Sequence, residues 1–117
     1  MIPFKNRFHG HGGLRYLYRN GHVARSRFAT LKYISAQNDK QPRFAVVVSK
    51  KIVKGAVKRN RIRRRVYGYI ETKSKEIKPG SDVVIIITAP EVLTLHYGEI
   101  KSAIDELFHE SKLYKSS

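Results

Sequence analysis

The residues from Lys58 to Arg65 carry the densest binding chemistry of the chain. They read Lys-Arg-Asn-Arg-Ile-Arg-Arg-Arg, and eleven lysines and arginines but no Asp or Glu lie between Lys40 and Ile70. Ammonium and guanidinium groups bind phosphate oxygens through charge-assisted hydrogen bonds. Like charges four residues apart on a helix repel each other by about 0.2–0.5 kcal/mol per pair. A run of this kind therefore indicates a polyanionic partner, and nucleic acid fits best.

The charge is also directional along the sequence. Residues 1–70 hold eighteen lysines and arginines against one acid, Asp39, whereas residues 71–117 hold six against eight acids. The formal net charge of +15 therefore comes from the first two thirds of the chain. Within the basic run, Asn60 is either an ordinary cap or turn residue or a donor to a phosphate or base edge.

Residue sets that do catalysis are absent from the sequence. The chain has no cysteine, which excludes disulfides, thiolate chemistry and Cys-based zinc sites. It has no serine motif with a partner His and Asp and no Gly-rich phosphate loop. His9 and His11 flank Gly10 with no Asp or Glu nearby, so we expect no metal site there. The sequence predicts a binder without an active site of its own.

Length and hydropathy indicate one small domain, residues 1–117, with residues 1–13 as a flexible basic arm. No apolar run approaches the ~20 residues that cross a bilayer, and the N-terminus lacks the apolar stretch of a secretory signal. We expect a cytoplasmic protein.

The apolar periodicity predicts the order helix, strand, strand, helix, strand, helix, an α+β sandwich with helices against a small sheet. A short first helix starts near Leu14 and ends at Asn20-Gly21. The polar connection that leads to Pro42 indicates a hairpin between the first two strands. The remaining elements are expected at 27–35 (strand), 43–51 (strand), 56–73 (helix), 82–88 (strand) and from 94 or 96 to 113 (helix).

Alternation and helical spacing assign faces to these elements. The strand 43–51 directs Phe44, Val46 and Val48 to the core. Its other face carries small residues, then a polar one, then a basic one, and is a plausible floor for a nucleic-acid strand. The residues of that face are Ala45, Val47, Ser49 and Lys51. The strand 82–88 is apolar throughout and is expected to be covered on both sides. The helix 56–73 is predicted to bury Ile62, Val66, Tyr69 and Ile70. The last helix is predicted to bury Ile100, Ile104, Leu107 and Phe108.

Aromatic side chains beside basic segments are candidates for stacking on bases. Each such stack contributes about 1–3 kcal/mol to binding of single strands. The candidates are Tyr18, Phe28, Tyr33 and Tyr67.

Two segments together resemble the protein subunit of bacterial ribonuclease P. They are Arg43-Phe44-Ala45-Val46-Val47-Val48-Ser49-Lys50-Lys51 and Ala56-Val57-Lys58-Arg59-Asn60-Arg61-Ile62-Arg63-Arg64-Arg65. The resemblance extends over about residues 14–113. It implies a two-layer α/β sandwich with a small mixed sheet, related to the second domain of a small-subunit ribosomal protein, and a left-handed crossover. Leu14 stands where the family usually has an aromatic, and Tyr18 matches a second aromatic position.

The resemblance implies a protein cofactor for an RNA enzyme that cleaves the 5′ leader from precursor tRNA. The holoenzyme is an endoribonuclease, its RNA carries the catalytic site, and Mg²⁺ is held mainly by that RNA. A monomeric protein in a 1:1 complex with the RNA subunit is expected. The residues implied to contact the RNA subunit are Lys58, Arg59, Asn60, Arg61, Arg63, Arg64 and Arg65. Those implied to line the leader site are Tyr18, Leu31, Tyr33, Ala45, Val47, Ser49, Lys50 and Lys51.

Two other functions fit a short basic chain. A small ribosomal protein would bind ribosomal RNA permanently and would copurify with ribosomes. A stand-alone nuclease would cleave precursor tRNA with magnesium alone, and the missing carboxylate cluster argues against it.

Overall fold

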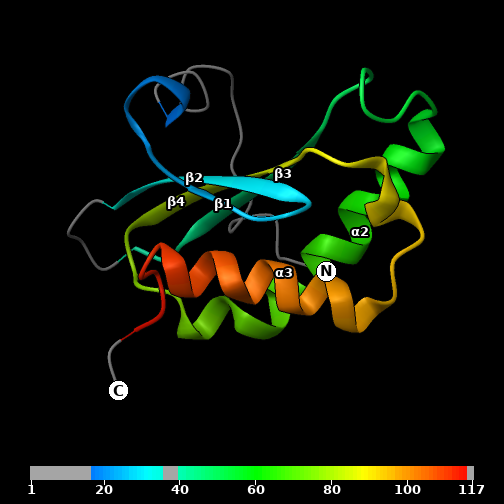
Figure 1. The fold of residues 1–117 in the computed structure, drawn as a ribbon. Helices are drawn as coiled ribbons and strands as arrows, with labels where there is room; N and C mark the ends of the chain where they lie inside the picture. The colour runs from blue at the N-terminus through cyan, green and yellow to red at the C-terminus, as the bar shows by residue number, and fades with distance from the viewer. Residues whose placement is uncertain (1–16, 36–39, 116–117) are drawn as a thin grey trace.

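A sheet with its two long helices packed on one side forms the body of the chain, and the computed structural model describes residues 17–35 and 40–115 (Figure 1). Residues 17–20 are helical and are called the first helix below. The later elements are β1 (His22–Arg25), β2 (Ala29–Ser35), β3 (Arg43–Val48), α2 (Ala56–Lys73), η2 (Ser74–Glu76), β4 (Ser81–Ile87), η3 (Pro90–Leu93) and α3 (Tyr97–Glu110). The predicted α+β class is confirmed. The predicted basic arm, residues 1–13, lies outside the described residues, as does Leu14.

The strands lie in the order β1-β2-β4-β3. β4 is antiparallel to β2 and parallel to β3, which makes the sheet mixed, and α2 supplies the crossover that a parallel pair requires. The predicted hairpin between β2 and β3 is wrong, because β4 lies between them. The hairpin instead joins β1 to β2, where Ser26 N–H donates to the Ala29 carbonyl at 2.9 Å.

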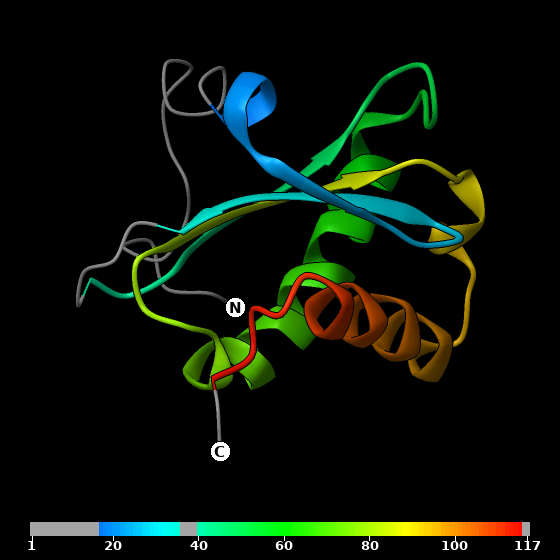
Figure 2. The same ribbon diagram turned by 60° about the vertical axis from the view of Figure 1, so that its left-hand side comes forward.

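One face of the sheet carries the main core, beneath α2 and α3 (Figure 2). The predicted helix stripes are confirmed, since all eight of their side chains are buried, and α3 adds Ala103. Phe44, Val46 and Val48 of β3 point into the same core, as predicted.

β4 is buried on both of its faces, as its unbroken apolar run predicts. Val83, Ile85 and Ile87 belong to the core beneath the helices. Val84 packs on the opposite side, against Leu17 and Ala45. The first helix therefore covers part of the second face of the sheet.

The end of the first helix depends on a close approach at Gly21, whose N–H donates to the Leu17 carbonyl at 2.8 Å. A Cβ at this position would lie 2.5 Å from the Leu17 oxygen and 3.2 Å from the Tyr33 oxygen. Gly98, in the first turn of α3, offers a matched control, because a Cβ there meets nothing within 4 Å.

We expect Gly21→Ala to lower the free energy of unfolding by about 1–3 kcal/mol, because backbone atoms must shift to admit the methyl group. Gly98→Ala should be neutral or should raise it by up to about 1 kcal/mol through helix propensity. Urea denaturation followed by circular dichroism measures both. Equal stability of the two variants would contradict the role given to Gly21.

Candidate nucleic-acid interface

The outward side of α2 forms a cationic ridge, defined here as Lys58, Arg61 and Arg64. All three side chains are exposed, and the first turn of the helix holds no acid. The unpaired N–H groups at a helix N-terminus add partial positive charge there. The first carboxylate along α2 is Glu71, close to its C-terminal end. The positive potential is therefore concentrated on the N-terminal two thirds of the helix.

Hydrogen bonds hold two further arginines beside the ridge. Arg59 donates through Nη1 to the carbonyls of Val53 and Lys54, at 2.9 and 2.7 Å. Arg63 donates through Nη2 to Oδ1 of Asn60, three residues earlier on the same side. Asn60 is exposed. Its side chain therefore orients a neighbouring guanidinium and does not cap the helix.

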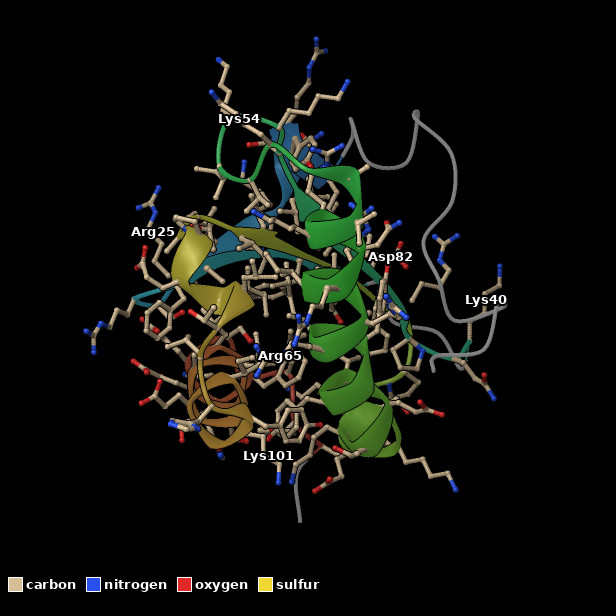
Figure 3. The ribbon with its side chains drawn as sticks, turned by 90° about the vertical axis from the view of Figure 1, so that its right-hand side faces the viewer. Arg25, Lys40, Lys54, Arg65, Asp82 and Lys101 are labelled. Carbon is tan, nitrogen blue, oxygen red and sulfur yellow. The ribbon has the colours of Figure 1, made fainter. Side chains whose placement is uncertain are left out.

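Arg65 has a structural role that its place in the basic run does not reveal. Its guanidinium is half-buried and donates to the carbonyls of Val92 at 3.0 Å, of Leu93 at 2.8 Å, and of Leu95. Figure 3 shows it between α2 and the segment that leads into α3. Arg65 thus satisfies backbone carbonyls of η3 and of Leu95, and the expectation that it also contacts RNA stays a prediction.

The turn after β3 places lysines beside the start of α2. β3 ends at Val48, so Ser49, Lys50 and Lys51 are turn residues and do not continue the strand as predicted. The Ser49 carbonyl accepts from the N–H of Val53 at 3.1 Å, and its hydroxyl oxygen accepts from the N–H of Ile52 at 3.3 Å. Lys50 and Lys51 are exposed. Lys54 projects from the same turn, at the N-terminal end of α2 (Figure 3).

The second face of the sheet, opposite α3, is a candidate strand-binding surface and is called the open face below. Residues 17–20 and the turn 49–55 both rise on this side (Figures 1 and 2). Strand register puts Lys32, Val84 and Ala45 in one row and Thr30, Ile86 and Val47 in the next. The open face comprises Val23, Arg25, Thr30, Lys32, Ile34, Arg43, Ala45, Val47, Asp82, Val84 and Ile86.

Leu17 and Tyr18 lie at the border of this face. Leu17 packs on Ala45 and Val84, which buries Ala45 to 7% exposure, and Val47 remains half-buried. Tyr18 is 39% exposed. The Lys32 ammonium lies 5.1 Å from the centre of the Tyr18 ring and donates to the Tyr18 carbonyl at 3.4 Å. Partial burial raises the pKa of the Tyr18 phenol, so its hydroxyl stays protonated at neutral pH.

Two residues expected at the leader site lie on the wrong side of the sheet. Leu31 is fully buried in the core beneath the helices, opposite Ile85 on β4. Tyr33 shares that face, packs against the same core, and stacks on His22 with the ring centres 5.2 Å apart. The alternating apolar residues Ala29 and Leu31 were the signal that would have placed both inward. The same alternation directs Thr30 and Lys32, which the sequence prediction omitted, to the open face.

Two of the proposed stacking aromatics are also occupied by the fold. Phe28 is half-buried against the core, with the Arg27 guanidinium 5.1 Å from its ring centre. The Tyr67 hydroxyl accepts from the N–H of Val46 at 3.1 Å and so covers the outer edge of β3. The prediction that Tyr67 points outward from α2 is therefore wrong. Of the four candidates, Tyr18 alone lies at the open face.

At one end of the open face, Arg43 and Asp82 form a two-pronged ion pair. Arg43 donates through Nε and Nη2 to the two carboxylate oxygens of Asp82, both at 2.8 Å. Asp82 partly neutralises Arg43, so this cation of the basic run is compensated locally. The remaining positive potential comes from the ridge and from the lysines of the turn.

Within residues 17–35 and 40–115, no three His, Asp or Glu side chains are grouped so as to hold a metal ion. In the same residues, no helix combines the length and the apolar content needed to span a bilayer.

Sequence comparison matches the chain to one family. The family described as Ribonuclease P matches residues 2–112. The Carboxydothermus hydrogenoformans "Ribonuclease P protein component" is 38% identical over 104 residues, covering 88% of this chain and 85% of that protein. The protein of the same name from Synechocystis is 30% identical over 95 residues, covering 81% of this chain and 76% of its own length.

Solved structures share the fold at lower identity. The Staphylococcus aureus RNase P protein superposes with a TM-score of 0.82 at 19% identity, over 94% of this chain and 98% of that one. The Thermotoga maritima RNase P protein superposes with a TM-score of 0.78 at 17% identity, over 89% and 96% of the two chains. The predicted two-layer architecture and family resemblance are confirmed.

The neighbouring residues Arg64 and Arg65 allow a direct test of their different roles. Arg65→Ala should lower the free energy of unfolding by about 2–4 kcal/mol, because it leaves carbonyls of η3 without a donor. Arg64→Ala should change it by less than about 0.5 kcal/mol, because that side chain is exposed. Thermal and urea unfolding of both variants measure the difference. Similar small effects would show that Arg65 does not hold η3.

Proposed function

Since the chain belongs to the ribonuclease P protein family, we propose that it binds the catalytic RNA subunit of ribonuclease P and the 5′ leader of precursor tRNA. Leader removal by the holoenzyme gives the mature 5′ end of tRNA. In this proposal the RNA carries the catalytic site, and the polypeptide contributes affinity and position. The family match favours this role over that of a ribosomal protein.

The cationic ridge is the proposed contact for the RNA subunit. Lys58, Arg61 and Arg64 are exposed on one side of a helix whose other side is locked in the core. A phosphate backbone neutralises such a row without requiring any particular base sequence. Arg59, Asn60 and Arg63 would add donors at its margin, since their side chains are already oriented by hydrogen bonds.

The open face is the proposed site of the leader. Its accessible floor combines two half-buried apolar side chains, Val47 and Ile86, with a cation, Lys32, next to Tyr18. A single strand laid across it would meet an aromatic ring for stacking and ammonium groups for its phosphates. Lys50 and Lys51 on the adjoining turn extend the positive charge toward the ridge.

Cleavage itself is assigned to the RNA with Mg²⁺ held mainly by RNA phosphates. The described carboxylates form no cluster that suits two-metal hydrolysis. The lysines and arginines of the ridge and turn would instead reduce phosphate repulsion, which lets RNA and substrate approach at lower Mg²⁺. We place this 1:1 complex in the cytoplasm, since the similar proteins come from bacteria.

The ridge predicts a change in salt dependence on mutation. Arg61→Ala with Arg64→Ala should weaken binding of the RNA subunit and reduce the slope of log K against log salt by about 0.7–0.9 for each phosphate that is no longer neutralised. Filter binding across a salt series measures the slope. Lys75→Ala with Lys115→Ala is the matched control, because both lysines are exposed outside the ridge. An unchanged slope for the Arg61/Arg64 variant would refute the assignment.

The open face predicts a loss specific to the leader. With the RNA subunit present, Lys32→Gln should weaken binding of precursor tRNA about three- to tenfold and leave mature tRNA nearly unaffected. Lys78→Gln removes the same charge from the loop before β4 and should affect neither. Equilibrium binding of both tRNA forms to the holoenzyme gives the comparison. Equal losses for precursor and mature tRNA would count against the open face as the leader site.

A further inference from the structure

A pocket lined by lysine and tyrosine side chains lies away from the ridge and the open face. It has a volume of about 400 Å³ and opens between the C-terminal part of α2 and the start of α3. Figure 3 shows Lys101 in this region, at the end of the molecule remote from Lys54. Pockets that hold one small ligand have volumes of roughly 300–1,000 Å³. Its lining residues are Tyr69, Thr72, Lys73, Tyr97 and Lys101.

Tyr97 gives this pocket an accessible aromatic surface. It is the first residue of α3 and is 40% exposed, one of four large apolar or aromatic side chains so exposed in the described residues. Its hydroxyl lies 4.0 Å from the position that a Cβ on Gly68 would occupy, so the ring leans against α2. The Lys101 ammonium lies 5.2 Å from the ring centre, one helical turn further on. The ammonium lies over one face of the ring, so a base stacks on Tyr97 once the Lys101 side chain swings from this face toward the phosphate.

The pocket walls carry positive charge in the acidic third of the chain. None of the five lining residues is an acid, although residues 71–117 hold eight acids. Lys73 of α2 lines the pocket together with Lys101, and its ion pair with Glu76, at 3.5 Å, is partly solvent-exposed and therefore weak. The Tyr69 hydroxyl donates to Asp105 Oδ1 at 3.5 Å, and burial raises its pKa, so Tyr69 itself stays protonated and uncharged, with the Asp105 carboxylate behind it.

We propose that the pocket binds one unpaired nucleotide of an RNA strand, with its base on Tyr97 and its phosphate between Lys101 and Lys73. Any base can stack on a tyrosine ring. The two lysines bind a phosphate as compact point charges, without the paired hydrogen bonds that an arginine guanidinium makes. Lys73 lies about 20 Å along α2 from Asn60, at 1.5 Å per residue. The pocket is therefore a contact point for RNA separate from the ridge, and it does not require the leader to lie on the open face.

Chemical-shift mapping of the full chain with mononucleotide, oligonucleotide and inorganic phosphate tests the proposal. Adenosine 5′-monophosphate should shift the backbone amides of Thr72 and Lys101, and an adenylate pentamer should shift the same amides at lower concentration. Tyr97→Ala should weaken this binding about 5- to 150-fold and Lys101→Gln several-fold, whereas Tyr97→Phe should retain it. Lys40→Gln, exposed before β3 and remote from Lys101 in Figure 3, is the charge-matched control and should bind as the unmodified chain does.

Three results would overturn the proposal. Shifts confined to the turn 49–55 and the start of α2 would show that nucleotides bind only the basic surfaces already described. Inorganic phosphate binding as tightly as the mononucleotide would reduce the pocket to an anion site without stacking. Tighter binding of the mononucleotide than of the pentamer would make it a site for free nucleotides.

The Arg61→Ala/Arg64→Ala chain separates this proposal from the function proposed above. If that chain loses the RNA subunit and still shows the pocket shifts, both proposals stand. If it binds the RNA subunit normally, the ridge assignment fails and the pocket is unaffected.

Discussion

Burial of one stripe of α2 is the constraint on which the rest of the structure depends. The opposite side of this helix places arginines at repulsive spacing, with no acid in the first turn, so it gains little from its own side-chain pairs. Ile62, Val66 and Ile70 are fully buried. Each contributes about 1.5–3 kcal/mol, against a few tenths of a kcal/mol per repulsive pair. Packing therefore prevails, and the core holds a positively charged helix in place before any polyanion binds.

The sheet topology brings the two proposed RNA-binding surfaces together. β3 and β4 are parallel neighbours, so the chain must leave β3, cross through α2 and return. The turn between β3 and α2 consequently joins the open face to the ridge within residues 49–55. A leader on the sheet and an RNA subunit on α2 would meet at this turn. One small polypeptide could in this way hold substrate and ribozyme in a fixed relation without taking part in bond breaking.

The sequence predicted the elements with strong periodicity and missed those set by tertiary pairing. The bounds of α2 and its buried stripe were predicted correctly, because 18 residues with one apolar side leave little freedom. β1 has only four residues, two of them His22 and Arg25, and carries no clear alternation. The insertion of β4 between β2 and β3 leaves no local signal either. The structural role of Arg65 was missed because charge density does not show which guanidinium donates to backbone carbonyls across the fold.

The central claim of our proposal is that the polypeptide binds RNA and that the RNA carries out catalysis. Cleavage of precursor tRNA at low Mg²⁺ by the chain alone, by the cognate RNA subunit alone, and by both together tests this most directly. We expect no cleavage by the chain, little by the RNA, and efficient release of the leader by the mixture. Cleavage by the chain alone, or no gain when it joins the RNA, would contradict the account.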